Sequence, residues 1–253
     1  METISNYTLQ PAEAALWWLG QAGYVIRAGG LTLVIDPYLS NAAAAGAAEF
    51  ARNYPPPLKA EALHADIFMV THDHLDHLDP ETISNYAFRD TTWFVAPRLA
   101  ARKLRSLGIP QERLVVLNAA EDWSIPDLEI RGIYALPTGI DVLDTTGFLI
   151  RFSNGRSVYH TSDTQYHPIV LAAAPQSPEV LLVPINGKWG NTGPEQAADL
   201  ACAVQPNYAI PNHYDMMRLN SEQPESFKWF CEHHRTPVKC EILEVMKPFI
   251  WKF

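Results

Sequence analysis

A run of histidine and aspartate side chains directly after a hydrophobic stretch is the feature that most constrains this chain. The hydrophobic stretch covers residues 66–70, and residues 71–79 read Thr-His-Asp-His-Leu-Asp-His-Leu-Asp. Neutral imidazole and carboxylate groups are ligands that borderline divalent metals prefer. Pro80 and Glu81 then favour the start of a helix, so the run lies in a predicted strand-to-helix loop. The candidate metal ligands in this loop are His72, His74, Asp76 and His77.

Further candidate ligands follow other predicted strands, because a single loop rarely completes the coordination sphere of a metal. Asp163 lies in the sequence His-Thr-Ser-Asp-Thr, and its two carboxylate oxygens can bridge two metals. His213 lies in Pro-Asn-His-Tyr-Asp, again just beyond a predicted strand. Asp36 follows the strand predicted for residues 31–35 and has two interpretations. It forms a hydrogen bond to a ligand histidine, or it only starts a turn before Pro37.

Hydrophobic stretches separated by glycine and proline predict many short strands with helices between them. Because strands dominate both halves, a sandwich of sheets flanked by helices fits better than a singly wound parallel sheet. The alanine-rich residues 41–48 and the proline triplet 55–57 predict a short helix and a stiff extended segment, which form either a surface loop or a lid. The predicted strands are 15–19, 24–28, 31–35, 66–70, 93–96, 114–117, 128–136, 147–152, 157–161, 180–184 and 208–210, and the predicted helices begin at Pro80 or cover 97–107, 194–204 and 223–234.

Composition and charge exclude several classes of protein. The 253 residues include 19 Lys and Arg against 28 Asp and Glu, a net charge of −9, and no basic run, so nucleic acid is not an expected partner. A hydrophobic content of 47% is enough for the core of one large domain over residues 1–253. The three widely spaced cysteines indicate free thiols in a reducing compartment. Without a secretory leader or a long apolar span, we expect a cytoplasmic protein with no membrane segment.

The motifs described above resemble, in order and over nearly the whole chain, those of the metallo-β-lactamase-fold hydrolases. The resemblance rests on Trp-Leu-Gly-Gln-Ala-Gly at 18–23, Ile-Asp-Pro at 35–37, the 71–77 segment, His-Thr-Ser-Asp at 160–163 and Pro-Asn-His-Tyr at 211–214. Within that superfamily, residues 159–166, 181–191 and 247–251 are most similar to the bacterial L-ascorbate-phosphate lactonase group. The resemblance implies an α/β fold, an αββα sandwich of two mixed β-sheets flanked by helices, with the metals at one edge between the sheets.

The resemblance also implies how the ligands hold one or two divalent metals, zinc or manganese. His72 and His74 hold the first metal, Asp76, His77 and His213 hold the second, and Asp163 bridges them. Superfamily members commonly supply another histidine to the first site, between the strands ending near residue 136 and beginning near residue 147. Residues 137–146 contain no histidine. The side chains that can replace it are Thr138, Asp141 and Asp144.

A mechanism follows from such a site. A divalent metal lowers the pKa of bound water towards ~7 and polarises a substrate oxygen, which predicts attack of metal-bound hydroxide on a lactone carbonyl. Asp76 is the candidate to orient that water and take its proton. His160 and Lys188 are candidates to stabilise the oxyanion or to bind substrate, although Lys188 is equally well interpreted as a solvated loop lysine. Arg52 is a candidate phosphate contact from the lid, and Tyr214 is a candidate substrate contact.

The leading hypothesis is a metal-dependent hydrolase that opens a small anionic lactone of the phosphorylated-sugar type. The alternatives are a metal-dependent phosphodiesterase, because one fold serves many substrates, and a non-catalytic metal-binding domain. A di-iron redox enzyme is disfavoured because a histidine, His74, occupies the motif position where a carboxylate is expected for that chemistry. The expected partner is a small-molecule substrate, and a homo-oligomer is an open alternative to a monomer.

Overall fold

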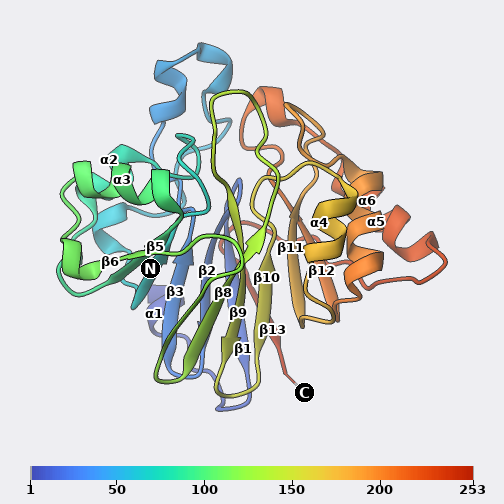
Figure 1. The fold of residues 1–253 in the computed structure, drawn as a ribbon, viewed down its shortest axis with the longest axis horizontal. Helices are drawn as coiled ribbons and strands as arrows, with labels where there is room; N and C mark the ends of the chain where they lie inside the picture. Colours follow the sequence, from blue (N-terminus) through green and yellow to red (C-terminus); the bar gives the residue numbers. More distant parts are fainter. Residues whose placement is uncertain (1, 253) are drawn as a thin grey trace.

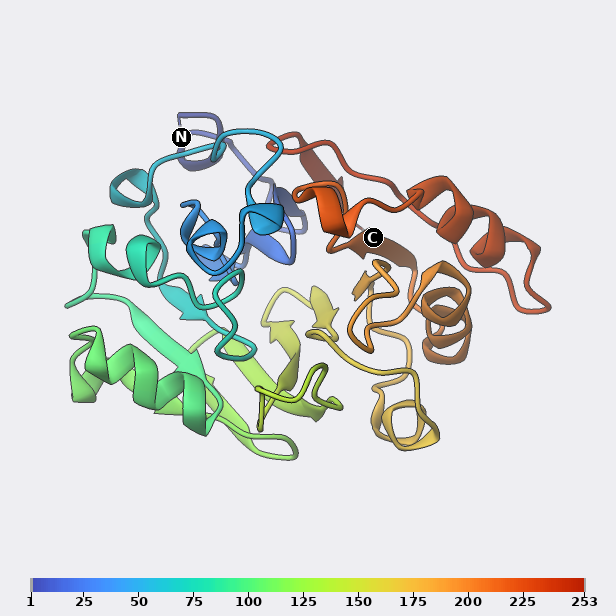
Figure 2. The same cartoon turned by 90° about the horizontal axis from the view of Figure 1, so that it is seen from above.

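Two mixed β-sheets pack face to face, with helices on their outer faces (Figure 1). The structure, a computed structural model, describes residues 2–252. Its architecture confirms the predicted αββα sandwich. Seen from above, the helices lie around the outside and the sheets lie between them (Figure 2). Among the described residues, no helix has the length and hydropathy needed to cross a membrane.

The first sheet has seven strands in the order β13-β1-β2-β3-β4-β5-β6. An antiparallel meander at its start is favoured by tight turns, and both Gly29 and Gly30 adopt positive φ between β2 and β3. From β3 to β6 the strands are parallel. The strands are β1 (Ala14–Gly20), β2 (Gly23–Ala28), β3 (Leu31–Ile35), β4 (Ile67–Met69), β5 (Trp93–Ala96), β6 (Leu114–Val116) and β13 (Pro248–Trp251).

The second sheet has six strands in the order β12-β11-β10-β9-β8-β7. Its antiparallel half comes first in the chain, and β10, β11 and β12 form a parallel half whose crossovers contain α4 and α5. The strands are β7 (Asp122–Ile125), β8 (Leu128–Tyr134), β9 (Thr146–Phe152), β10 (Ser157–His160), β11 (Val180–Pro184) and β12 (Tyr208–Asn212).

The helices pack on opposite sides of the sandwich, α2 and α3 beside the first sheet and α4, α5 and α6 beside the second (Figures 1 and 2). Proline at the first helical turn begins α2, α4, α5 and α6, where its fixed φ suits a helix start and its missing N–H costs nothing. The helices are α1 (Glu2–Ser5), α2 (Pro80–Asn85), α3 (Arg98–Ser106), α4 (Pro168–Ala173), α5 (Pro194–Val204) and α6 (Pro224–His233).

Strand β1 is buried on both faces. Its apolar side chains therefore require a packing layer on each side of the first sheet. Leu16 and Trp18 point into the core between the sheets. Trp17 and Leu19 belong to the core beneath α2 and α3. Side chains of successive strand residues point to opposite faces, so a fully apolar strand is stable only in the middle of such a sandwich.

Several elements differ from the sequence-based expectation. Residues 41–48 do not form one helix but parts of two 3₁₀ turns, Ala42–Ala45 and Ala48–Phe50, because Asn41 provides no side-chain cap and Gly46 interrupts the alanine tract. Strand β7 was not predicted because it is a polar edge strand, and β13 was not predicted because it begins at a proline. The three cysteines are free, as expected, and all three are buried.

Glu179, just before β11, joins the two sheets at the end of the sandwich opposite the histidine cluster. Its carboxylate accepts hydrogen bonds from the backbone N–H of Ser157 (2.9 Å) and from Nε1 of Trp251 in β13 (3.0 Å). It also lies 3.3 Å from Nη2 of Arg156, and both charged side chains are nearly fully buried. A buried charge with this many partners is costly to remove.

We predict that Glu179→Leu lowers the free energy of unfolding by about 3–5 kcal/mol, because it leaves buried donors without an acceptor. Glu129→Leu is the matched control, since Glu129 forms a half-exposed pair with Arg151 at 3.2 Å and should cost less than about 1 kcal/mol. Urea unfolding followed by circular dichroism measures both values. Equal losses in the two variants would contradict the role given to Glu179.

Candidate metal centre

The candidate ligands meet because parallel strands of both sheets end at the same edge of the sandwich. In the first sheet, Ile35 of β3 is paired with Met69 of β4, so Asp36 and the 71–77 loop start side by side. In the second sheet, Pro184 of β11 is paired with Asn212 of β12, which places His213 at that edge. Loops from both halves of the chain rise at this end in Figure 1. Ligands commonly bind outside the carboxyl ends of parallel strands.

Asp36 holds His77 by a short hydrogen bond. The Asp36 side chain is fully buried and accepts hydrogen bonds from the backbone N–H of Thr71 (2.8 Å), from the Thr71 hydroxyl (2.6 Å) and from Nδ1 of His77 (2.7 Å). When the ring is neutral, a donating Nδ1 leaves Nε2 of His77 as the nitrogen with a free lone pair. This is the contact to a candidate ligand histidine that the first interpretation of Asp36 required.

His72 and His74 lie side by side, and Asp141 lies beyond them. Nε2 of His72 is 3.0 Å from Nδ1 of His74, and Nε2 of His74 is 3.3 Å from Oδ1 of Asp141. Burial lowers the pKa of His72 well below its usual value, and the neighbouring His77 lowers it further. The hydrogen bond with His74 lowers the pKa of Asp141.

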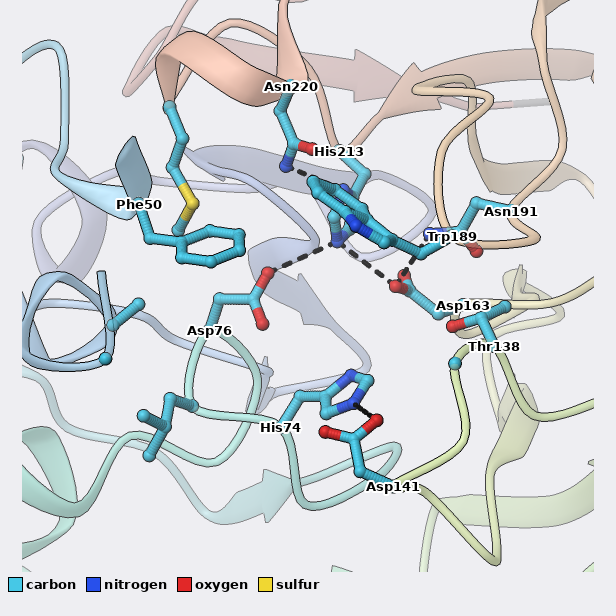
Figure 3. A pocket seen from close by; sticks show the side chains of 15 residues that line it. Phe50, His74, Asp76, Thr138, Asp141, Asp163, Trp189, Asn191, His213 and Asn220 are labelled. Atoms are coloured by element: carbon cyan, nitrogen blue, oxygen red, sulfur yellow. Dashed lines mark hydrogen bonds and ion pairs between the residues drawn. The ribbon is translucent and has the colours of Figure 1, made fainter. Parts of the chain in front are cut away.

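Asp76 and Asp163 approach His213 from opposite sides (Figure 3). Nε2 of His213 is 3.3 Å from Oδ2 of Asp76 and 3.2 Å from Oδ2 of Asp163. Gln21 donates its amide to Oδ2 of Asp76 at 2.7 Å, and Asn191 donates its amide to Oδ2 of Asp163 at 2.8 Å. Each carboxylate is therefore oriented by one amide and leaves its other oxygen available.

The electrostatics of the cluster are those of closely packed opposite charges. Burial lowers the pKa of His77, but Asp163, Asp76 and Asp36 outweigh burial and raise it well above its usual value. Burial also lowers the pKa of His213, yet Asp163 and Asp76 raise it to about 9. Burial raises the pKa of both Asp76 and Asp163, but the two histidines hold each of them below the usual range. The carboxylates thus require nearby positive charge.

The donor set fits a divalent metal. Two groups of three side chains, His72 with His77 and Asp163, and Asp76 with His77 and His213, bring one ligand atom each within 4.8 Å of one another. Oδ1 of Asp163 is buried without a hydrogen-bond partner. Nε2 of His77 and Nε2 of His213 face each other at 3.3 Å. A divalent cation supplies positive charge and a partner for these atoms.

A cavity of about 360 Å³ opens onto the cluster. His74, Asp76, Asp163 and His213 contribute to its lining, whereas His72 and His77 do not and are fully buried below it. Apolar side chains form much of the rest of the wall, namely Ala43, Phe50, Leu75, Trp189 and Met217. Phe50 and Trp189 are in contact, with ring centroids 5.8 Å apart.

The 41–57 segment covers one side of this cavity, so of its two interpretations the lid fits the structure better. The backbones of Arg52 and Met217 form an isolated antiparallel β-bridge. The backbone N–H of Asn53 donates to the carbonyl of Met216 at 2.7 Å. The Asn53 amide also donates to the carbonyl of Asp215 at 2.9 Å. The segment is thus tied to the stretch that follows His213.

His160 does not reach the cavity, contrary to its predicted part in oxyanion or substrate binding. Its ring is fully buried, and Nε2 donates to the carbonyl of Ala22 at 3.0 Å while Nδ1 accepts from the backbone N–H of Ser162 at 3.0 Å. Burial lowers its pKa, which favours the neutral ring. His160 is the last residue of β10 and points into the sandwich. Its ring connects the turn at Ala22 with the loop at Ser162.

The three predicted substrate contacts also lie outside the cavity lining. Lys188 is exposed to solvent, while its neighbours Trp189 and Asn191 line the cavity. The guanidinium of Arg52 donates to the carbonyls of Tyr38 (2.7 Å) and Tyr54 (3.0 Å), so it holds the 41–57 segment together. Tyr214 is buried with its ring 5.0 Å from that of Trp18. Arg52 and Tyr214 therefore have structural contacts, and Lys188 is a solvent-exposed loop residue.

The structure adds residues that sequence reasoning did not select. Gln21, Trp189 and Asn191 lie inside motifs that carried the family resemblance, and that position was the available signal. Phe50 and Asn220 stand outside every motif, so no sequence signal pointed to them. Of the three substitutes for the missing histidine, only Asp141 contacts a candidate ligand. Asp144 accepts a hydrogen bond from the backbone of Leu99 instead.

Comparisons with known proteins agree with this geometry. A family model described as a beta-lactamase superfamily domain matches residues 15–213. A UPF0173 metal-dependent hydrolase of Pyrobaculum islandicum is 30% identical over 214 residues, covering 83% of this chain and 88% of the relative. Igni18, a metallo hydrolase of Ignicoccus hospitalis, superposes with a TM-score of 0.77 at 22% identity, covering 95% and 99% of the two chains. An isothiocyanate hydrolase from Delia radicum gut bacteria gives 0.75 at 17%, covering 94% and 99%.

The fold, the strand-end ligands and the family match define a member of the β-lactamase superfamily. Within that superfamily, the chain belongs to the UPF0173 metal-dependent hydrolase family. It is accordingly a metal-dependent hydrolase by family, with a His and Asp cluster as its candidate metal site. The narrower resemblance to the ascorbate-phosphate lactonase group stays a prediction.

We predict that Asp36→Asn weakens metal binding about 10–100-fold. Asparagine has a single acceptor oxygen, and the backbone N–H of Thr71, which can only donate, favours that oxygen at the Oδ1 position. The amide nitrogen then faces Nδ1 of His77, so the ring would place its proton on Nε2, the nitrogen proposed to hold the metal. Asp66→Asn is the matched control, because Asp66 accepts a backbone hydrogen bond from Thr32 at 2.8 Å outside the candidate metal site. Zinc affinity is measured by competition with a chromophoric chelator, with the metal content of the dialysed native chain as reference. Equal affinities in the native chain and Asp36→Asn would contradict this role.

Proposed function

We propose that this chain hydrolyses small, uncharged esters or lactones that carry an apolar group. The observation that carries the proposal is the composition of the cavity, in which an apolar wall stands directly above a cluster of histidines and carboxylates. Its volume of about 360 Å³ suits a small molecule. The proposal keeps the predicted lactone and replaces the predicted phosphorylated substrate.

The charge of the cavity argues against an anionic substrate. Among residues 2–252, no lysine or arginine lines it, while Asp76, Asp141 and Asp163 do. Recognition of a phosphate requires charge-assisted hydrogen bonds from cationic side chains or from a bound metal. Phe50 and Trp189 instead offer aromatic faces to an apolar substituent. A phosphodiester also carries negative charge, and among residues 2–252 no cationic side chain of the cavity lining would neutralise it, which leaves that task to the metal.

The residues that would hold metal are those that the family resemblance implies, with one substitution. His72 and His74 would hold a first ion, and Asp76, His77 and His213 would hold a second, with Asp163 between them. We propose that Asp141 stands in for the missing first-site histidine, because its carboxylate lies 3.3 Å from Nε2 of His74. When bound, a divalent metal would supply Lewis acidity, lowering the pKa of water towards ~7 and polarising a carbonyl oxygen.

Asp76 is proposed to take the proton of the attacking water. Its side chain is partly exposed to the cavity, whereas that of Asp163 is almost fully buried. Gln21 orients it through the 2.7 Å hydrogen bond to Oδ2, which leaves Oδ1 directed to incoming groups. The pKa of Asp76 lies below its usual range because His77 and His213 outweigh burial, so the carboxylate is ionised.

We expect Asp76→Asn to fold normally and to lose activity about 10²–10⁴-fold, because an amide cannot accept the proton. Asp73→Asn is the matched control: it makes the same change of charge in the same loop, and Asp73 does not line the cavity. Initial rates on a chromogenic ester, with metal content measured in each sample, test the prediction. Near-native turnover by metal-loaded Asp76→Asn would remove Asp76 from the mechanism.

We expect a neutral lactone with a phenyl or alkyl substituent to be hydrolysed with a kcat/KM at least about tenfold higher than its phosphorylated analogue. The difference corresponds to about 1.4 kcal/mol, less than the contribution of one charge-assisted hydrogen bond. The panel also includes a phosphodiester and an aryl isothiocyanate, the latter because it is small, apolar and electrophilic. Trp189→Ala should raise KM for the phenyl lactone more than for a methyl analogue.

Preference for the phosphorylated lactone would restore the original sequence-based hypothesis and refute the uncharged-substrate proposal. Hydrolysis confined to the phosphodiester or the isothiocyanate would keep the hydrolase and replace the ester substrate. Equal effects of Trp189→Ala on the phenyl and methyl lactones would show that Trp189 does not contact the substituent. Metal-loaded protein that hydrolyses none of these compounds would refute the substrate class as a whole.

A further inference from the structure

Two buried asparagines stand behind His213, on the side away from Asp76 and Asp163. The amide nitrogen of Asn220 is 3.1 Å from Nδ1 of His213, and the amide nitrogen of Asn186 donates to Oδ1 of Asn220 at 3.3 Å. Both asparagine side chains are almost completely buried. Burial of such polar groups is costly unless they are hydrogen-bonded.

The orientation of the Asn220 amide determines which nitrogen of His213 carries a proton. When the amide nitrogen donates to Nδ1, that atom is the acceptor and Nε2 bears the hydrogen. Nε2 then donates to the carboxylates of Asp76 and Asp163, 3.3 and 3.2 Å away. In that tautomer, Nε2 has no lone pair for a metal.

A half-turn of both amides gives the opposite tautomer and keeps the number of hydrogen bonds that the two asparagines make. The amide nitrogen of Gln21, 3.4 Å from Nδ1 of His213, then donates to Oδ2 of Asp76 alone. Oδ1 of Asn220 then accepts from Nδ1–H of His213, and its nitrogen donates to Oδ1 of Asn186, an atom that otherwise has no hydrogen-bond partner. The amide nitrogen and oxygen have nearly the same size, so the packing is unchanged. Each orientation has one bond between the asparagines and one to the ring.

We infer that Asn220, supported by Asn186, is a positioning residue for His213. It accepts from Nδ1–H when Nε2 is a metal ligand. The inference rests on the proposed metal site and not on the proposed substrate. It gives His213 the same kind of support that Asp36 gives His77, through a neutral amide in place of a carboxylate.

The test compares two substitutions of similar size in the full-length protein. Asn220→Leu cannot accept a hydrogen bond, and we expect it to weaken zinc affinity about 10–100-fold. Asn220→Asp accepts from Nδ1–H, and we expect it to bind zinc at least as tightly as the native chain. A merely structural role predicts the reverse order, because a buried carboxylate disturbs packing more than leucine does. Thr92→Val is the control, since it removes buried hydrogen bonds outside the metal site and should leave zinc affinity unchanged.

Long-range ¹H–¹⁵N NMR of the zinc-loaded native chain provides a readout that needs no variant. Protonation of Nδ1 of His213, with its proton hydrogen-bonded to Asn220, is the expected result. An unprotonated Nδ1, or a folded Asn220→Leu protein with native zinc affinity, would overturn the inference. If Asn220→Leu does not fold, a weaker zinc affinity of Asn220→Asp than of the native chain would likewise overturn it. Native chain that binds zinc but hydrolyses no ester overturns only the proposed substrate.

Discussion

The coincidence of strand ends from two separate sheets is the constraint on which the site depends. Asp36 and the 71–77 loop come from the first sheet, and Asp163 and His213 come from the second. The backbone N–H of Thr146 in β9 donates to the carbonyl of Thr71 at 3.0 Å, which joins the two sheets beside the ligands. The distances from His213 to Asp76 and from His77 to Asp163 therefore depend on how the sheets pack, and a shift between the sheets would change them.

This arrangement buries several charged groups, and amide side chains provide many of their hydrogen bonds. Gln21 orients Asp76, Asn191 orients Asp163, and Asn220 contacts His213. Neutral amides form hydrogen bonds with the carboxylate oxygens and the imidazole nitrogen without adding charge to the cluster. Asp36 is the exception, because its carboxylate is satisfied by three donors and fully enclosed.

Sequence reasoning succeeded where local pattern and topology coincide. A hydrophobic stretch followed by His or Asp places that side chain at the carboxyl end of a strand, and this rule brought together His72, His77, Asp163 and His213. It failed for His160, because the pattern does not say which face the last strand residue takes. It left two alternatives for Lys188, and the exposed side chain fits the solvated loop lysine. Loop conformation decides this exposure, with positive φ at Gly187, Trp189 and Gly190. Asn220 depends on tertiary contacts alone.

The link between the 41–57 segment and the residues after His213 has a thermodynamic consequence. Phe50 on that segment and Asn220 on the other both line the cavity, and the backbone contact at Asn53 and Met216 lies between them. If a molecule that contacts the 41–57 segment changes the affinity of His213 for a metal by some factor, the metal must change the affinity for that molecule by the same factor. Metal binding and substrate binding would then be linked through this contact.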